Sequence, residues 1–240
     1  MTITFMKAIE NILMHNNLTK NMIAMKKIKT IMWLTLTFSV LVLVSCSKAN
    51  DDTNTNTDNQ HVIISDDGKA SNGSIFSNID DKNFYLDYIK YTVKEGHLIV
   101  SGYDKSGFKG TANIVSSIKY KGNFYEVLEI GSRAFFSNKE LTYVSLPKCI
   151  KNIDFFAFHG CSGLTSITIP NQVSTIVAGA FFGCKGIIAI HCLGTTPPNV
   201  NSDVFDTETY DKATLYVPRG STKAYKSQTE WMKFKNIVEE

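Results

Sequence analysis

The sequence predicts a mainly β solenoid in which about 23 residues form each of three to four coils. Two observations carry this prediction: an Ala-Phe pair recurs at a spacing of 23, and aliphatic residues recur at fixed places between the pairs. One such unit cannot bury its apolar side alone. Stacked units can, because each apolar position then forms a column through a shared core. The pairs are Ala134-Phe135, Ala157-Phe158 and Ala180-Phe181.

The repeat has the consensus V-x-x-I-x-x-x-A-F-x-x-C-x-x-L-x-x-I-x-I-P, whose L-x-x-I-x-I part is the strand signature of leucine-rich repeats. In the central copy, alternation points Ile167 and Ile169 into the core. It points Ser166 and Thr168 out to solvent. Pro170 then ends the strand, since it has no amide hydrogen to donate. We expect the Ala-Phe pair in a turn, where the Phe ring fills the gap between coils.

The repeat motifs of this chain resemble the BspA-like leucine-rich repeats of bacterial surface proteins, over roughly residues 110–240. The resemblance implies a secreted or surface-attached, non-catalytic recognition protein. The chain departs from the repeat pattern where Cys192 replaces an aliphatic residue and where Gly194-Thr195-Thr196-Pro197-Pro198 interrupts the period. We interpret these departures as the closing of the array, because a terminal repeat must cover the exposed core. The matching stretches are 130–135, 160–170 and 215–221, followed by Ala224-Tyr225 and Trp231.

Two hairpins are expected upstream of the repeats and form a predicted N-terminal cap. Residues 84–93 and 97–103 read as strands joined at Lys94-Glu95-Gly96, where Gly96 supplies a positive φ. Residues 114–120 and 124–130 read as a second pair. The predicted segments are a signal peptide (1–45), a lipidated Cys and tether (46–62), an N-terminal β cap (63–126), leucine-rich repeats (127–209) and a C-terminal cap (210–240).

The N-terminus predicts export and lipid anchoring. A Lys-rich start precedes an apolar run of 14 residues, Ile31 to Val44, which is shorter than the roughly 20 residues that span a membrane. The run leads into Leu43-Val44-Ser45-Cys46, which resembles the lipobox of bacterial lipoproteins. That resemblance implies cleavage before Cys46 and acylation of Cys46, hence an envelope location at the outer membrane or cell surface. The alternatives are an uncleaved anchor that ends in a free Cys, and a true start at Met25.

The segment after Cys46 has the composition of a solvated tether, since residues 47–60 contain no large apolar side chain. The charge of the remaining chain argues against nucleic acid as a partner. Residues 1–45 hold five lysines and one acid, so 20 basic and 21 acidic residues remain of the 25 and 22 in the whole chain. Phosphate binding needs a clustered basic face on the folded part.

The cysteines and histidines offer no clear catalytic or metal site. Cys161 and Cys184 occupy one repeat position, where buried thiols, a disulfide or a metal site are alternatives; no C-x-x-C or H-x-x-x-H spacing favours metal. Alternation separates His191 from Cys192, which argues against a catalytic dyad. Aspartates 66, 67, 80 and 81 lack the spacing of an EF-hand loop. We therefore predict no enzyme, no metal and no cofactor.

A recognition surface is expected where the strands line one face of the solenoid. The outward residues are polar or aromatic and carry no net charge, which suits contact with a protein or a glycan through tyrosine rings and hydroxyl groups. Solvated sheet without a ligand is the alternative for this face. At the level of function, the alternative is a structural subunit of an envelope complex that has no soluble ligand. The predicted ligand-binding residues, called the outward strip below, are Tyr143, Ser145, Ser166, Thr168, His191, Thr214 and Tyr216.

Overall fold

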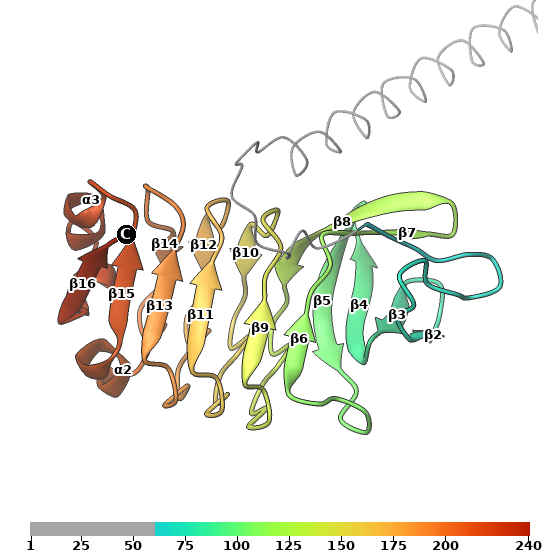
Figure 1. Cartoon of the computed structure of the whole chain (residues 1–240), viewed down its shortest axis with the longest axis horizontal. Coiled ribbons are helices and arrows are strands. Elements are labelled where there is room, and N and C mark those ends of the chain that lie inside the picture. Colours follow the sequence, from blue (N-terminus) through green and yellow to red (C-terminus); the bar gives the residue numbers. More distant parts are fainter. Residues whose placement is uncertain (1–60) are drawn as a thin grey trace, which may run out of the picture. The chain divides into compact units, whose positions relative to one another are not determined.

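The computed structural model describes residues 61–240, which lie within the unit formed by Asp52–Glu240. The predicted signal peptide, Cys46 and all but the last two residues of the predicted tether lie outside the described residues. Within residues 61–240, no helix has the length and apolar character needed to cross a bilayer. The described chain begins with mostly antiparallel strands and continues as a stack of parallel ones (Figure 1).

Tight two-residue turns connect the strands of the antiparallel region. Three two-residue turns have positive φ at both positions, namely Asp87-Tyr88, Glu95-Gly96 and Lys121-Gly122. That is the geometry of a type I′ turn, whose twist matches that of the flanking strands. The strands are β1 (His61–Ile63), β2 (Phe76–Asn78), β3 (Asn83–Leu86), β4 (Ile89–Lys94), β5 (His97–Tyr103), β7 (Ser117–Tyr120) and β8 (Asn123–Ile130).

Two expectations for this region need correction. The single strand predicted at 84–93 is two strands, β3 and β4, which the turn at Asp87-Tyr88 folds against each other. The buried side chains show the reason. Phe84 and Leu86 are buried at even positions, whereas Ile89 and Tyr91 are buried at odd ones, so the alternation of buried and exposed residues changes phase across the turn. The predicted tether ends too late, because β1 begins at His61 and pairs with β7. The second hairpin, β7 with β8, is confirmed.

Each coil of the repeat contributes to two parallel ladders, and the coils stack with the expected period. Ile130, Ile153 and Ile176 pair in one ladder at steps of 23 residues, and Ile167 pairs with Ile190 at the same step in the other. Parallel pairing begins before the predicted start at 127, since β5 pairs with β8 and β6 with β9. The added strands are β6 (Thr111–Asn113), β9 (Tyr143–Ser145), β10 (Asn152–Ile153), β11 (Ser166–Ile169), β12 (Thr175–Ile176), β13 (Ala189–Cys192) and β14 (Asn199–Val200).

The core is a column of phenylalanine rings that runs through the coils. Phe135, Phe158 and Phe181 are fully buried, and successive ring centroids lie 5.3 and 5.2 Å apart with interplanar angles of 3° and 4°. Phe205 continues the column 5.3 Å beyond Phe181. The expectation that each Phe fills the gap between coils is confirmed. The next pair, Val204-Phe205, comes one residue later than the 23-residue step requires, and both of its side chains are nevertheless buried.

The C-terminal region adds one strand that the sequence did not reveal. β16 pairs in parallel with β15 and becomes the last strand of the β11-β13-β15-β16 sheet. Asp206 joins this region to the repeats, because its carboxylate accepts hydrogen bonds from the backbone N–H groups of Thr209 and Gly183, each at 3.0 Å. The elements are α2 (Thr207–Lys212), β15 (Thr214–Val217), α3 (Thr222–Lys226), the 3-10 helix η1 (Trp231–Lys233) and β16 (Asn236–Glu239).

Candidate recognition surface

The strand register places most of the outward strip in two columns on one sheet face. In the first column, Ser166 pairs with Ala189 and Ala189 with Thr214. In the second, Thr168 pairs with His191 and His191 with Tyr216. The residues between them, Ile167, Ile190 and Leu215, are at most 1% exposed and belong to the core. The predicted division into outward and inward positions therefore holds for these strands.

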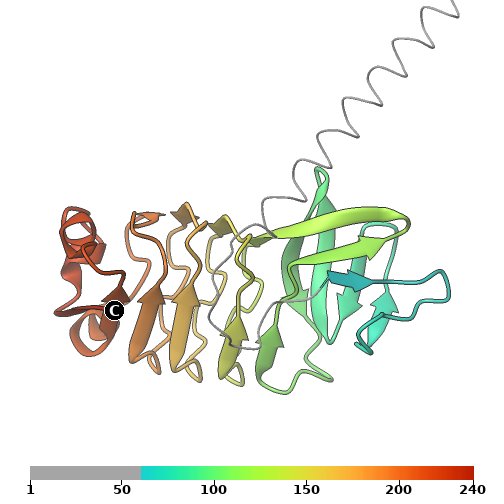
Figure 2. The same cartoon turned by 45° about the horizontal axis from the view of Figure 1, so that its top comes forward.

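Tyr143 and Ser145 extend this face through strand β9. This strand lies beside β11 in both views (Figure 1, Figure 2). On its other side β9 pairs with β6, which sets Thr111 beside Tyr143 and Asn113 beside Ser145. Tyr143 is 46% exposed, so much of its ring is open to solvent.

The face is longer than predicted at both ends. Thr111 and Asn113 join it at one end, and Asn236 and Val238 of β16 join it at the other, next to Thr214 and Tyr216. A search at a fixed period misses these residues, because Thr111 pairs across an offset of 32 and Asn236 across an offset of 22. The alternation of Ala112 and Ile114 with polar neighbours was the available signal for β6.

The face lacks fixed charge but has one structured aromatic corner. None of its outward positions is Asp, Glu, Lys or Arg. The His191 ring stacks on Tyr216, with centroids 4.5 Å apart and an interplanar angle of 5°. Nδ1 of His191 also lies 2.9 Å from Oε1 of Glu240, which follows β16. This contact and the ring stack hold His191 in place, so the face presents a Tyr-His pair beside hydroxyl and amide groups.

The buried thiols belong to the core and form no bridge with each other. Cys161 and Cys184 are unbridged and fully buried, and each donates to a carbonyl of the preceding coil, Phe135 at 3.1 Å and Phe158 at 3.0 Å. Of the three alternatives, the structure shows buried thiols. Contact with the Cys161 thiol, together with burial, raises the pKa of Cys184. Burial raises the pKa of Cys192 to about 12 and keeps this thiol protonated at neutral pH.

We expect the thiols of the folded chain to resist alkylation at pH 8. A thiolate is the reactive form, and an exposed Cys has a pKa of about 8.5, so unfolding in denaturant will make Cys184 and Cys192 reactive. Because burial raises the folded-state pKa of Cys192, its contribution to stability is complete below about pH 8.5 and declines as pH rises toward about 12. Mass spectrometry after maleimide labelling measures the reactivity. Rapid labelling of Cys192 at pH 8 without denaturant would contradict its burial.

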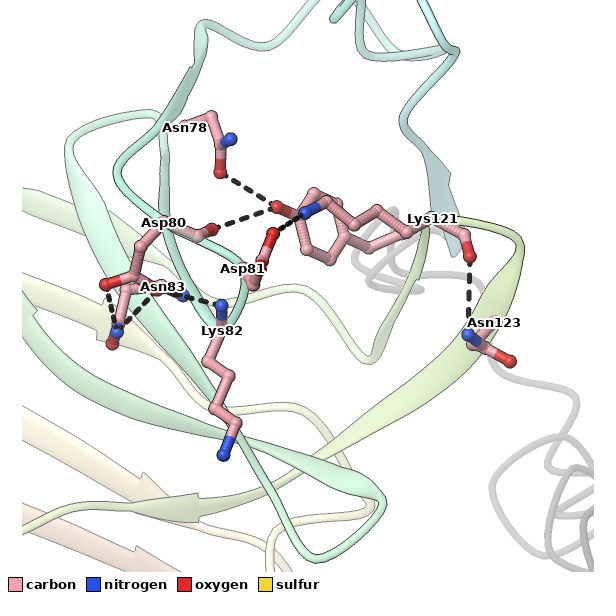
Figure 3. Close-up of polar contacts among 8 residues, drawn as sticks. Asn78, Asp80, Asp81, Lys82, Asn83, Lys121 and Asn123 are labelled. Carbon is pink, nitrogen blue, oxygen red and sulfur yellow. Dashed lines mark hydrogen bonds and ion pairs between the residues drawn. The ribbon is translucent and has the colours of Figure 1, made fainter.

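The acidic loop before β3 closes on itself (Figure 3). Asp80 accepts hydrogen bonds from the backbone N–H groups of Lys82 and Asn83 and from the Asn83 side-chain amide, and these bonds lower the pKa of its carboxyl. Asp81 pairs with Lys121 across the loop. Within residues 61–240, no group of three His, Cys, Asp or Glu residues is placed to hold a metal ion. These carboxylates act as loop supports.

Comparison with known proteins identifies the repeat. The BspA type leucine rich repeat region matches residues 77–212 in six copies. A solved leucine-rich repeat protein from Bacteroides capillosus is 20% identical, with a TM-score of 0.50 over 57% of this chain and 99% of that chain. None of the curated proteins matches this chain.

Two longer solved proteins also match part of this chain. A leucine-rich repeat protein from Bacteroides ovatus is 24% identical, with a TM-score of 0.47 over 65% of this chain and 40% of that chain. A leucine rich cell surface protein from Faecalibacterium prausnitzii is 17% identical, with a TM-score of 0.46 over 68% of this chain and 44% of that chain. This chain thus spans less than half of either protein. The repeat match covers more than half of the chain and takes in the stacked coils as well as the antiparallel strands β2 to β4 before them. The protein belongs to the BspA-type leucine-rich repeat family.

Proposed function

We propose that this chain is a non-catalytic recognition module of the bacterial cell envelope, and that the outward strip binds a protein or a glycan. The single observation that carries the proposal is the continuous face without fixed charge, from β6 to β16, with an exposed tyrosine and a stacked Tyr-His pair. Protein interfaces are depleted of charge at their centre and enriched in tyrosine. Neutral glycans use the same hydroxyl and aromatic contacts.

The two end regions support this role as caps. We infer that the antiparallel strands before the repeats and the region from 210 to 240 cover the open ends of the column of rings, as a stack of repeats requires. Trp231 is 1% exposed and donates from Nε1 to the carbonyl of Pro198 at 3.0 Å, and its ring lies 6.1 Å from Phe205, the last ring of the column. A short stack offers a small surface, so one copy binds with modest affinity and several copies on a cell bind more strongly.

We expect the Tyr143→Ala/Tyr216→Ala double variant to bind its ligand at least about 30-fold more weakly, since large amphipathic rings often contribute about 2 kcal/mol or more to an interface. A partner recovered by crosslinking on intact cells, or a neutral polysaccharide retained by the protein, is titrated against both proteins. The rings project from the sheet, so circular dichroism of the double variant will show normal folding.

The control is the Cys161→Ala/Cys184→Ala double variant. It removes buried groups and so lowers the thermal unfolding temperature, while ligand affinity stays the same. Unchanged affinity in the tyrosine variant would move the site off the outward strip. A face that retains neither a protein nor a polysaccharide would favour the second function considered above, a structural subunit of an envelope complex.

The proposed anchor is Cys46, with residues 47–60 as its tether. Fourteen residues reach about 46–50 Å when fully extended, at roughly 3.3–3.6 Å per residue, which allows the folded part to stand clear of the lipid. Replacement of Cys46 by Ala is expected to release the protein from the membrane fraction or to leave the uncleaved precursor. Fractionation followed by mass spectrometry distinguishes these results. A Cys46→Ala protein that is still cleaved and still floats with membranes would contradict the anchor.

A further inference from the structure

A second exposed feature lies on the turns of the repeat, next to the core column of rings. Position 136 of the first coil recurs as 159 and 182, and the three rings stack, with centroids 5.0 Å apart from Phe136 to His159 and 5.7 Å from His159 to Phe182. Phe155 and Phe156 join them from the central coil, 3.8 Å apart. Phe136, Phe155 and Phe182 are 40%, 38% and 41% exposed. We call these five residues the aromatic cluster.

The central coil carries these rings at a cost in backbone strain. Residues 133, 156 and 179 occupy one repeat position, and all three have positive φ, at 58°, 56° and 68°. The third coil uses glycine there, whereas the second uses Phe156, although an L side chain is disfavoured in this conformation. The neighbouring position is Ser132 in the first coil and Ala178 in the third, but Phe155 in the second. Phe156 is half-buried, with its ring packed over Gly179 of the next coil. Phe155 is 38% exposed and neither neighbouring coil carries a ring at its position, so this exposed ring points to a function rather than to folding.

Two side chains of opposite charge, Arg133 and Asp154, adjoin the cluster. The Arg133 guanidinium lies 5.8 Å from the Phe136 ring and is paired with no carboxylate among the described residues. Asp154 uses one carboxylate oxygen to accept from the N–H of Phe155 at 2.7 Å. A surface with an apolar centre, one cation and one anion is complementary to itself under a two-fold rotation, because Arg133 can then face the Asp154 of another copy.

We propose that the aromatic cluster is an interface with a second copy of this chain, separate from the outward strip. The stacked arrangement argues against a glycan, since sugar rings pack on aromatic faces and here the faces of Phe136, His159 and Phe182 are turned toward one another. The His159 ring lies half-buried between two phenylalanines. The exposed edges of the phenylalanine rings leave an apolar surface that another aromatic cluster can cover by edge-to-face packing.

Crosslinking of the full chain in intact cells tests the proposal. Ser132→Cys places an accessible thiol beside the cluster, and a bifunctional maleimide should give a product of twice the chain mass. Adding Phe155→Ser and Phe156→Gly, the residue types that other coils carry at these positions, should lower the yield on the order of tenfold. Phe155→Ser alone, which leaves the contact between Phe156 and Gly179 in place, should lower the yield with little change in the unfolding temperature. Ile188→Thr, at a position that is Thr142 and Thr165 in other coils, removes a 66% exposed apolar residue outside the cluster and should not change the yield.

A charge exchange tests the two-fold arrangement directly. Arg133→Glu or Asp154→Lys alone should lower the yield, because like charges then face each other across the axis, and the combined variant should restore it. The protein without Ser132→Cys gives the background from other thiols. No product of double mass, a product of another mass, or a double variant that crosslinks no better than either single variant would each overturn the proposal.

Discussion

Phe158→Ala is expected to destabilise the folded chain by about 3–5 kcal/mol, the usual cost of emptying a fully buried phenylalanine site. Phe158 is 0% exposed and lies between the rings of Phe135 and Phe181, at 5.3 and 5.2 Å. Neighbouring coils can collapse onto the cavity only by shortening the two strand ladders that hold them apart. Such a loss is a large part of the roughly 5–15 kcal/mol that stabilises a typical domain.

Urea unfolding followed by circular dichroism measures this effect. Phe182→Ala is the matched control. It removes a phenylalanine side chain from the next coil, at a position that is 41% exposed. The control should lose about 1 kcal/mol or less, because its ring is already partly in water. Equal losses in the two variants would mean that the column of rings does not carry the stability of the stack.

Gly163→Ala is expected to cost at least about 1–3 kcal/mol, the range for a core that is overpacked. Its φ is not in the left-handed region, so the effect comes from the distance between coils. A Cβ at this position would lie 2.4 Å from the carbonyl oxygen of Lys139 and 3.0 Å from that of Leu141. Both contacts are with backbone, so the added methyl group forces the two coils apart. Gly186, one repeat later, meets Ser162 in the same way at 2.5 Å.

Gly102→Ala provides the comparison, because a Cβ there would make only an ordinary contact at 3.9 Å with the Lys90 side chain. Its unfolding free energy should stay within about 0.5 kcal/mol of the parent, or rise slightly as the unfolded chain loses freedom. A tolerated Gly163→Ala would show that the coils can separate without breaking the ladders. The two glycines therefore test whether close coil contact is a condition of this fold.

The repeated part of the fold could be predicted from the sequence because one rule places many residues. Once Ala134-Phe135 recurs at a fixed step, stacking assigns Ile167 and Ile190 to the core and His191 to the surface. The rule fails where pairing depends on other offsets, as for Thr111 of β6 and Asn236 of β16. There the strands are held by turns and by the capping region, and periodicity carries no information about either.

The candidate surfaces show a different limit. Alternation gave the direction in which each side chain of the outward strip points, but not that the His191 ring stacks on Tyr216 or that Glu240 pairs with it. Those contacts join residues whose positions along the chain are unrelated by the repeat. The aromatic cluster was visible in the sequence as extra phenylalanines beside Ala157-Phe158, yet only backbone φ shows that Phe156 is strained.

Among the strands of residues 61–240, β16 is the last of its sheet, and one of its edges pairs with none of them. Such an edge can template the aggregation of other chains. Two acids occupy it. Glu239 accepts from the N–H of Thr222 at 3.1 Å, and Glu240 lies beside His191. Their negative charges repel the same edge of a neighbouring molecule, and their contacts hold the strand against its own sheet. The edge is thereby protected against fibril-like association with other copies of the chain.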